Sequence, residues 1–145
     1  MANTTNFGWE TPDDTDLVKD GALAIRTLAG SIDTSFGQIT LNAQTGTTYT
    51  FVLADNRNKI VTGDNASPIT FSIPTNASVA FPIGSVINVV QIGVGQITIN
   101  AVTSGTTTIA STGATSAAPK LRARYSAAAC VKVATDVWYV IGDLA

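Results

Sequence analysis

The hydrophobic pattern of this chain changes its period once, near Gly37. Before Gly37, apolar side chains recur with the 3.6-residue period of an amphipathic helix. After it, apolar and polar side chains alternate with the period of two that a half-buried strand requires. Val, Ile and Thr dominate this second part, as is typical of a pleated sheet. The sequence therefore predicts a mainly β protein that begins with an N-terminal arm and a single α-helix.

The helix is expected to run from about Pro12 to Phe36. Thr11 suits the N-cap position and Pro12 suits the first helical position. Three carboxylates of the first turn favour the positive end of the helix dipole: Asp13, Asp14 and Asp16. Gly37 is a good residue at which a helix can end.

Four apolar residues of this helix resemble the seam of a coiled coil. Val18, Ile25 and Ile32 are spaced by seven, and Leu28 lies three residues after Ile25. Repeated Ile at the first core position favours three strands over two. Two interpretations stay open, namely an ordinary helix packed on its own domain and a helix that associates with copies of itself. Because no second helix is predicted, we expect a homotrimer with these residues at its seam.

Ten segments after Gly37 have the alternation of strands, and turn residues separate them. They are Ile39–Leu41, Thr48–Asp55, Lys59–Thr62, Ile69–Ile73, Ser85–Ile92, Gln96–Val102, Thr106–Ala110, Lys120–Tyr125, Ala127–Ala134 and Val137–Ile141. Turns at such short intervals predict an antiparallel β-sandwich or barrel. We therefore expect two domains: residues 1–37, an attachment arm with a trimerising helix, and residues 38–145, a β-domain.

Two hairpins are expected within the β-domain. One joins Ser85–Ile92 to Gln96–Val102 through Gly93-Val-Gly95. The other joins Ala127–Ala134 to Val137–Ile141 through Thr135-Asp136.

Charge is scarce throughout the chain. The net charge is −2, only 12% of the residues are charged, and none is charged from Asn65 through Pro119. A surface with so few charges would be poorly soluble in a free monomer, so we expect neighbouring subunits to cover part of it. The chain has no basic excess, so nucleic acid is not an expected partner. No apolar run reaches the length of a membrane span, so no membrane partner is expected.

The residue inventory does not predict an enzyme. Histidine is absent, which removes the usual general base near neutral pH. No Cys/His cluster or phosphate-binding loop is present, and Asp55 with Asp64 only weakly imitates a calcium loop, so no catalytic residue, metal or cofactor is expected. The single cysteine, Cys130, lies in an apolar run and is expected to be a buried thiol.

Two groups of residues are candidates for partner contacts. Phe7 and Trp9 lie on the polar N-terminal arm, where they serve either as a staple onto the helix or as an anchor into another protein. Lys120, Arg122 and Arg124 alternate, so a strand would present them on one face as a basic ladder. That ladder is either a solvated surface or a contact for an anionic partner.

Parts of the sequence resemble tailed-bacteriophage virion proteins. Asn6-Phe-Gly-Trp-Glu-Thr-Pro, with Ile25-Arg-Thr-Leu and Ser31-Ile-Asp33, resembles the N-terminal segment of tail fibre and minor tail proteins. Four further segments are similar to a small β-domain near the C-termini of phage fibres: Ser78-Val-Ala-Phe-Pro-Ile-Gly-Ser-Val-Ile, Gly93-Val-Gly-Gln-Ile-Thr-Ile, Lys120-Leu-Arg-Ala-Arg-Tyr-Ser and Val137-Trp-Tyr-Val-Ile-Gly-Asp-Leu144. Together these similarities cover most of the chain.

The resemblance implies a homotrimer that is attached to the virion by the arm with Phe7 and Trp9. We expect a non-enzymatic virion structural protein, a short tail fibre or spike that contacts other phage proteins and a host surface glycan. The chain lacks the long shaft and the enzymatic domain of many such fibres, so a capsid decoration or head-fibre protein is the alternative. An alternative of another class is a carbohydrate-binding module, in which Trp138 or Tyr139 stacks on sugar; the favoured interpretation of these two residues is that they are core or interface aromatics.

Overall fold

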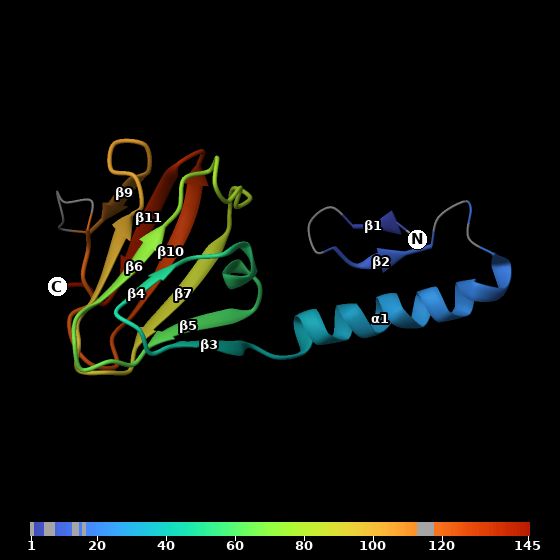
Figure 1. Ribbon diagram of the computed structural model, residues 1–145, viewed down its shortest axis with the longest axis horizontal. Coiled ribbons are helices and arrows are strands. Elements are labelled where there is room, and N and C mark those ends of the chain that lie inside the picture. Colours follow the sequence, from blue (N-terminus) through green and yellow to red (C-terminus); the bar gives the residue numbers. More distant parts are fainter. Residues whose placement is uncertain (1, 5–7, 13–14, 16, 113–117) are drawn as a thin grey trace. The chain divides into compact units, whose positions relative to one another are not determined.

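The computed structural model describes residues 2–4, 8–12, 15, 17–112 and 118–145. The chain divides into two compact units, Met1–Ile39 and Thr40–Ala145, here called the first and the second unit (Figure 1). Strands predominate in the described residues and one α-helix is present, which confirms the mainly β prediction.

The first unit is a helix covered on one side by a short hairpin. Strands β1 (Ala2–Asn3) and β2 (Glu10–Thr11) pair antiparallel, and β2 contacts the helix. A 3₁₀ turn, η1 (Val18–Asp20), leads into the helix α1 (Gly21–Gly37). Ala24, which is 3% exposed, is the buried residue of α1.

The prediction that the helix begins at Pro12 is wrong. Thr11 lies in β2 opposite Ala2, and its hydroxyl donates a hydrogen bond to the Ala2 carbonyl oxygen (3.1 Å), so it does not cap a helix. The helix ends at Gly37, as predicted. The proposed first-turn aspartates Asp13, Asp14 and Asp16 lie outside the described residues.

The described residues of the second unit form two sheets (Figure 1). The larger has the strand order β3-β5-β7-β10-β11-β9, and the smaller has the order β4-β6-β8. The strands are β3 (Thr40–Gln44), β4 (Thr48–Thr50), β5 (Lys59–Gly63), β6 (Ile69–Ile73), β7 (Val86–Gln91), β8 (Ile97–Ala101), β9 (Thr108–Ser111), β10 (Ala127–Ala134) and β11 (Val137–Gly142). A 3₁₀ turn, η2 (Leu53–Asn56), follows β4 where the sequence predicted a continuing strand.

The sheets are mixed, so the antiparallel prediction is wrong. From β3 to β8, successive strands alternate between the two sheets, and within each sheet they pair in parallel. Gly63 pairs with Gln91 and Ile69 pairs with Ile97, each pair 28 residues apart, so these two stretches stack in register as successive turns of a coil. The predicted hairpin of β7 with β8 is therefore absent, because Gly93-Val-Gly95 carries the chain from one sheet to the other. The β10–β11 hairpin is confirmed.

Stacked turns explain why glycine is needed at this crossing. The Gly95 N–H donates to the Asn65 carbonyl oxygen (2.9 Å), and the Asn65 side-chain amide donates to the Thr45 carbonyl oxygen (2.6 Å). A Cβ at Gly95 would lie 1.9 Å from the Ser67 carbonyl oxygen, so no other residue fits without moving the neighbouring turn.

Buried side chains of both sheets form one hydrophobic core. Phe51 and Phe71 meet edge to face with ring centroids 5.7 Å apart, and Phe81 meets Trp138 in the same way at 5.3 Å. Cys130 is fully buried, as predicted, and burial raises the pKa of its thiol to about 12.

Candidate functional site

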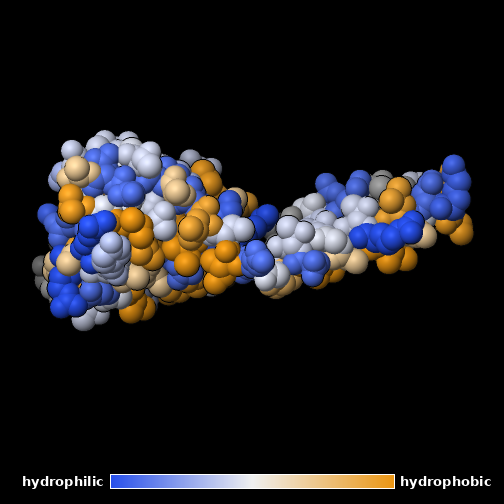
Figure 2. All heavy atoms as spheres, turned by 90° about the horizontal axis from the view of Figure 1, so that it is seen from below, coloured by the Kyte–Doolittle hydropathy of each residue, from blue (hydrophilic) through white to orange (hydrophobic). Residues whose placement is uncertain are grey.

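An exposed apolar stripe runs along α1 and the preceding 3₁₀ turn. Val18, Ile25 and Ile32, here called the helix stripe, are 98%, 63% and 39% exposed. Phe36, which is 66% exposed, lies beside Ile32 one turn further along the helix. Hydrophobic residues are visible along this part of the chain in Figure 2.

The hairpin occupies a neighbouring face of the helix and not the stripe. Ala24, Leu28, Ser31 and Ser35 are less exposed than their neighbours and share one side of α1. At about 100° per residue, Ile25 and Ile32 lie about a quarter-turn from that side. Of the four predicted seam residues, three therefore form the exposed stripe, and Leu28 turns toward the hairpin. The hairpin beside the helix was not predicted from the sequence, since two-residue strands leave no periodic signal.

Trp9 packs on its own helix in the first unit. Its indole Nε1 donates a hydrogen bond to Ser35 Oγ (3.1 Å), and its ring meets the Phe36 ring at a centroid distance of 6.0 Å. The neighbouring Gly8 has a φ of 66°, in the left-handed region, which lets the arm turn back into β2. Trp9 thus makes the contact expected of a staple onto the helix, which is one of the two interpretations of this residue from the sequence. Phe7, the second arm aromatic, lies outside the described residues.

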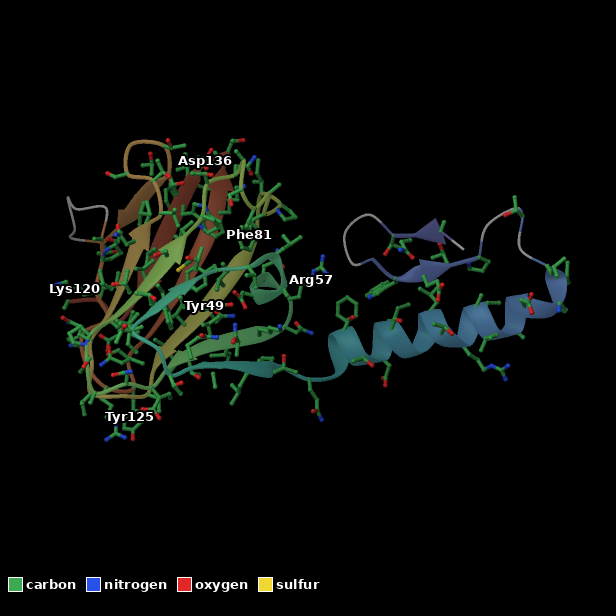
Figure 3. The ribbon with its side chains drawn as sticks, viewed as in Figure 1. Tyr49, Arg57, Phe81, Lys120, Tyr125 and Asp136 are labelled. Carbon is green, nitrogen blue, oxygen red and sulfur yellow. The ribbon has the colours of Figure 1, made fainter. Side chains whose placement is uncertain are left out.

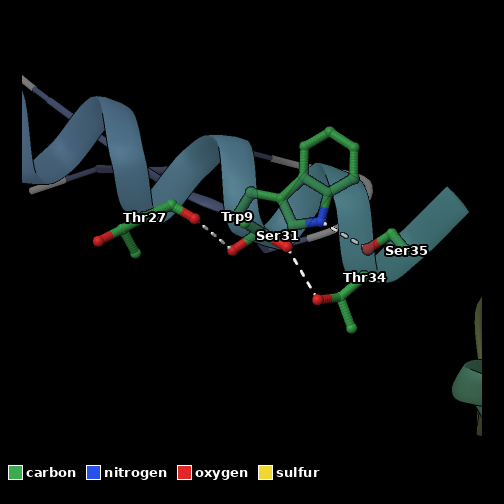
Figure 4. A pocket seen from close by; sticks show the side chains of 6 residues that line it. Trp9, Thr27, Ser31, Thr34 and Ser35 are labelled. Carbon is green, nitrogen blue, oxygen red and sulfur yellow. Dashed lines mark hydrogen bonds between the residues drawn. The ribbon is translucent and has the colours of Figure 1, made fainter. Parts of the chain in front are cut away.

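A pocket of about 530 Å³ lies beside Trp9 (Figure 4). Its lining is polar and comes from one face of α1: Thr27, Gly30, Ser31, Thr34 and Ser35. Two of its hydroxyls already donate to helix carbonyl oxygens, Ser31 to Thr27 (3.0 Å) and Thr34 to Gly30 (2.8 Å). The pocket is a shallow surface, and none of its described lining residues is charged.

The predicted basic ladder does not form. Lys120 and Leu121 make only isolated bridges, and the chain then turns, with Tyr125 in the left-handed region at a φ of 69°. The turn is closed by a hydrogen bond from the Ser126 N–H to the Ala123 carbonyl oxygen (3.0 Å). The strand prediction for Lys120–Tyr125 is therefore wrong, because alternation continued through a turn that side-chain type does not reveal.

The two arginines of this segment interact within their own chain. Arg122 pairs with Asp143, and hydrogen bonds from Ser126 and then Arg122 hold the pKa of the Asp143 carboxyl below its usual range. Arg124 Nε donates to the Ile92 carbonyl oxygen (2.7 Å), and its guanidinium lies 4.8 Å from the Tyr125 ring centroid. Figure 3 shows Lys120 and Tyr125 away from the end of the unit that carries Asp136.

A buried carboxylate, Asp55, was not anticipated as a structural centre. It is 0% exposed and accepts hydrogen bonds from the Asn42 side-chain amide (2.8 Å), the Tyr49 hydroxyl (2.8 Å) and the Val52 N–H (2.9 Å). Burial, and then the hydrogen bond to Asp55, raise the pKa of Tyr49 to about 12. Asp55 therefore joins β3, β4 and η2 and is not placed as a ligand of a calcium loop.

A buried lysine fastens the loop that precedes β7. Lys132, 2% exposed, donates through Nζ to Asn76 Oδ1 (2.5 Å) and to the Phe81 carbonyl oxygen (2.7 Å). Asp136 accepts a hydrogen bond from the Asn76 N–H (2.6 Å). Burial lowers the pKa of Lys132, and the charge of Asp136 opposes that shift. The sequence analysis did not identify Lys132 as a buried residue, because nothing in the local pattern names the partners of its ammonium group.

The described residues offer no metal centre, since nowhere among them do three or more His, Cys, Asp or Glu side chains gather. Within the same residues, no helix is both long and apolar enough to cross a membrane.

Comparison with protein-family models, curated proteins and solved structures found no match for the chain.

Proposed function

We propose that this chain is a non-enzymatic structural protein of a bacteriophage virion, a short homotrimeric tail fibre or spike. In this proposal the two sheets of the second unit form a sandwich, and the first unit joins the subunits. The observation that carries the proposal is the helix stripe, because Val18, Ile25 and Ile32 combine seven-residue spacing with high exposure.

Self-association would bury apolar side chains that are exposed to solvent in the single subunit. The hairpin covers one side of α1, yet Ile25 and Ile32 remain 63% and 39% exposed. A row of β-branched residues at this spacing is the arrangement that packs between parallel helices. Three strands fit the repeated Ile better than two, which supports the trimer.

The N-terminal arm is proposed as the virion attachment, on the strength of its resemblance to phage fibre segments. Trp9 already contacts Ser35 and Phe36, so the attachment surface would be the folded hairpin and not an extended peptide. The second unit would then contact the host surface, with a surface glycan as the proposed ligand.

The carbohydrate-binding alternative has little support from the aromatic residues. Trp138 is 1% exposed and packs against Phe81, so its ring is not available to a sugar. Tyr139, on the opposite face of β11, is 46% exposed but lies on an apolar sheet surface with no charged neighbour in its row.

Labelling of purified phage particles tests the proposal. An antibody raised against the chain should decorate particles, and gel densitometry of the same particles should give the copy number. Few copies at the tail support the fibre or spike, and many copies over the shell support the capsid decoration or head-fibre alternative. Absence of the chain from particles that carry its gene would overturn the virion assignment.

A further inference from the structure

The outer faces of the two sheets of the second unit differ sharply in chemistry. The outward side chains of the three-stranded sheet are hydroxyls and an amide, in two rows that cross its strands: Thr48-Thr70-Thr98 and Thr50-Ser72-Asn100. They alternate with buried core residues such as Phe71 and Ile99. A polar outer face of this kind is typical of a sheet that faces water.

The outer face of the six-stranded sheet is apolar. One row crosses five strands and reads Leu41-Ile60-Asn88-Ala129-Ile141, with four apolar side chains and one amide. Leu41 is 68% exposed and Ile141 is 54% exposed. We call this surface the apolar sheet face.

A second row of the apolar sheet face has the same character. It reads Val86-Val131-Tyr139-Ala110 across four strands and contains no charged residue. Val86 is 40% exposed and Tyr139 is 46% exposed. The other sheet of the same unit shows that this chain can supply polar residues to a sheet surface, so the apolar rows indicate a surface that is covered.

The size of the face sets what can cover it. Six strands at roughly 4.8 Å spacing span about 24 Å, and four residues along a strand add about 13 Å, a flat footprint on the order of 300 Å². This area is at the lower end of the largest apolar patch on a typical monomer, about 300–600 Å², and such patches are often functional. A stable interface buries about 800 Å² per partner, so this face would be one part of a larger interface.

We infer that the apolar sheet face packs against the apolar sheet faces of other copies of this chain. This inference rests on the proposed homo-oligomer and names the surface through which the second units meet. A face without charge offers nothing to an ionic partner, whereas another copy presents a matching neutral surface. The helix stripe in the same chain already favours copies over a foreign partner.

Charge insertion in the full-length chain tests the inference. Leu41→Glu and Ile141→Glu each place a carboxylate on the apolar sheet face, at positions exposed in the subunit. Because an unpaired charge in an interface is costly, each variant should weaken association by about a hundredfold in sedimentation equilibrium. Thr50→Glu, an exposed position on the polar face, should leave association unchanged.

The outcomes separate this inference from the proposed oligomer. A wild-type chain that is monomeric at all concentrations overturns the oligomer itself. A wild-type chain that is oligomeric, with all three Glu variants associating equally well, overturns the inference and leaves the oligomer standing.

Thiol labelling gives a second readout that does not require dissociation. In the assembled protein, a maleimide should label Tyr139→Cys at least about tenfold more slowly than Thr50→Cys, because only the former would be covered. The native Cys130 is fully buried and does not compete. Equal labelling rates in an oligomeric sample would overturn the inference, even if a Glu variant failed to fold.

Discussion

Replacing Ile25 and Ile32 together with alanine should dissociate the proposed trimer without unfolding the subunit. The two side chains are 63% and 39% exposed, and burying a whole Ile side chain contributes about 1.5–3 kcal/mol. The surface that association can still bury is therefore worth about 1.5–3 kcal/mol per subunit for the pair. Substitution of both residues with alanine removes most of this contribution to association, about 1–2 kcal/mol per subunit.

Across three subunits the loss comes to about 3–6 kcal/mol per trimer, which corresponds to a change of about 10²- to 10⁴-fold in the dissociation constant. Sedimentation equilibrium over a range of concentrations measures this constant directly, and circular dichroism reports whether α1 persists.

Leu23→Ala is the matched control. Leu23 is 58% exposed, comparable to Ile25, but it lies about 160° around the helix from it. The control should leave the dissociation constant unchanged. Equal weakening by Leu23→Ala, or no effect of the double substitution, would refute the argument that the helix stripe is the seam.

Three further predictions concern the second unit. Asp55→Ala removes the acceptor of three buried hydrogen bonds and should lower the free energy of unfolding by about 3–5 kcal/mol, whereas Tyr49→Phe should lower it by about 1 kcal/mol. Urea titration followed by tryptophan fluorescence, to which Trp9 and Trp138 both contribute, compares the two variants with the wild type, and equal losses would contradict this account. The phenol of Tyr49 should ionise near pH 12 in the folded chain, so its contribution to stability is complete below pH 10 and is lost as the pH rises toward 12. Tyrosinate absorbance and alkaline unfolding, each compared between the wild type and Tyr49→Phe, measure this pKa and the loss of stability. Ionisation of Tyr49 near pH 10 would contradict the prediction. Cys130 should resist thiol reagents in the native protein and react fully in denaturant. Rapid labelling of Cys130 in the native protein would show that β10 is not packed as described.

The sequence was sufficient to predict features that depend on local pattern. A change of period marked the single helix and the β part, Gly37 marked the end of α1, and the Thr135-Asp136 turn marked the β10–β11 hairpin. The burial of Cys130 followed from its place in an apolar alternating run. Each of these features is set by residues close together in the chain.

Features that depend on distant pairing were not predictable in the same way. The alternation of apolar and polar residues indicates which side chains are buried, but it does not indicate which strands pair. The sequence therefore predicted a hairpin of β7 with β8, although these strands belong to different sheets. Thr11 suits a helix cap by type, yet its pairing with Ala2 places it in a strand.

The candidate site was predicted in part. Spacing identified Val18, Ile25 and Ile32, and the structure leaves all three exposed. The position of Leu28 depends on a two-residue hairpin that has no sequence signature.

The mass of the full-length chain in solution tests the central claim most directly. At micromolar concentration, light scattering should give about 45 kDa, three times the 14.9 kDa of one subunit. A mass of one subunit for a chain that keeps its helix and its sheets, with Ile25 and Ile32 still open to solvent, would contradict the proposed assembly.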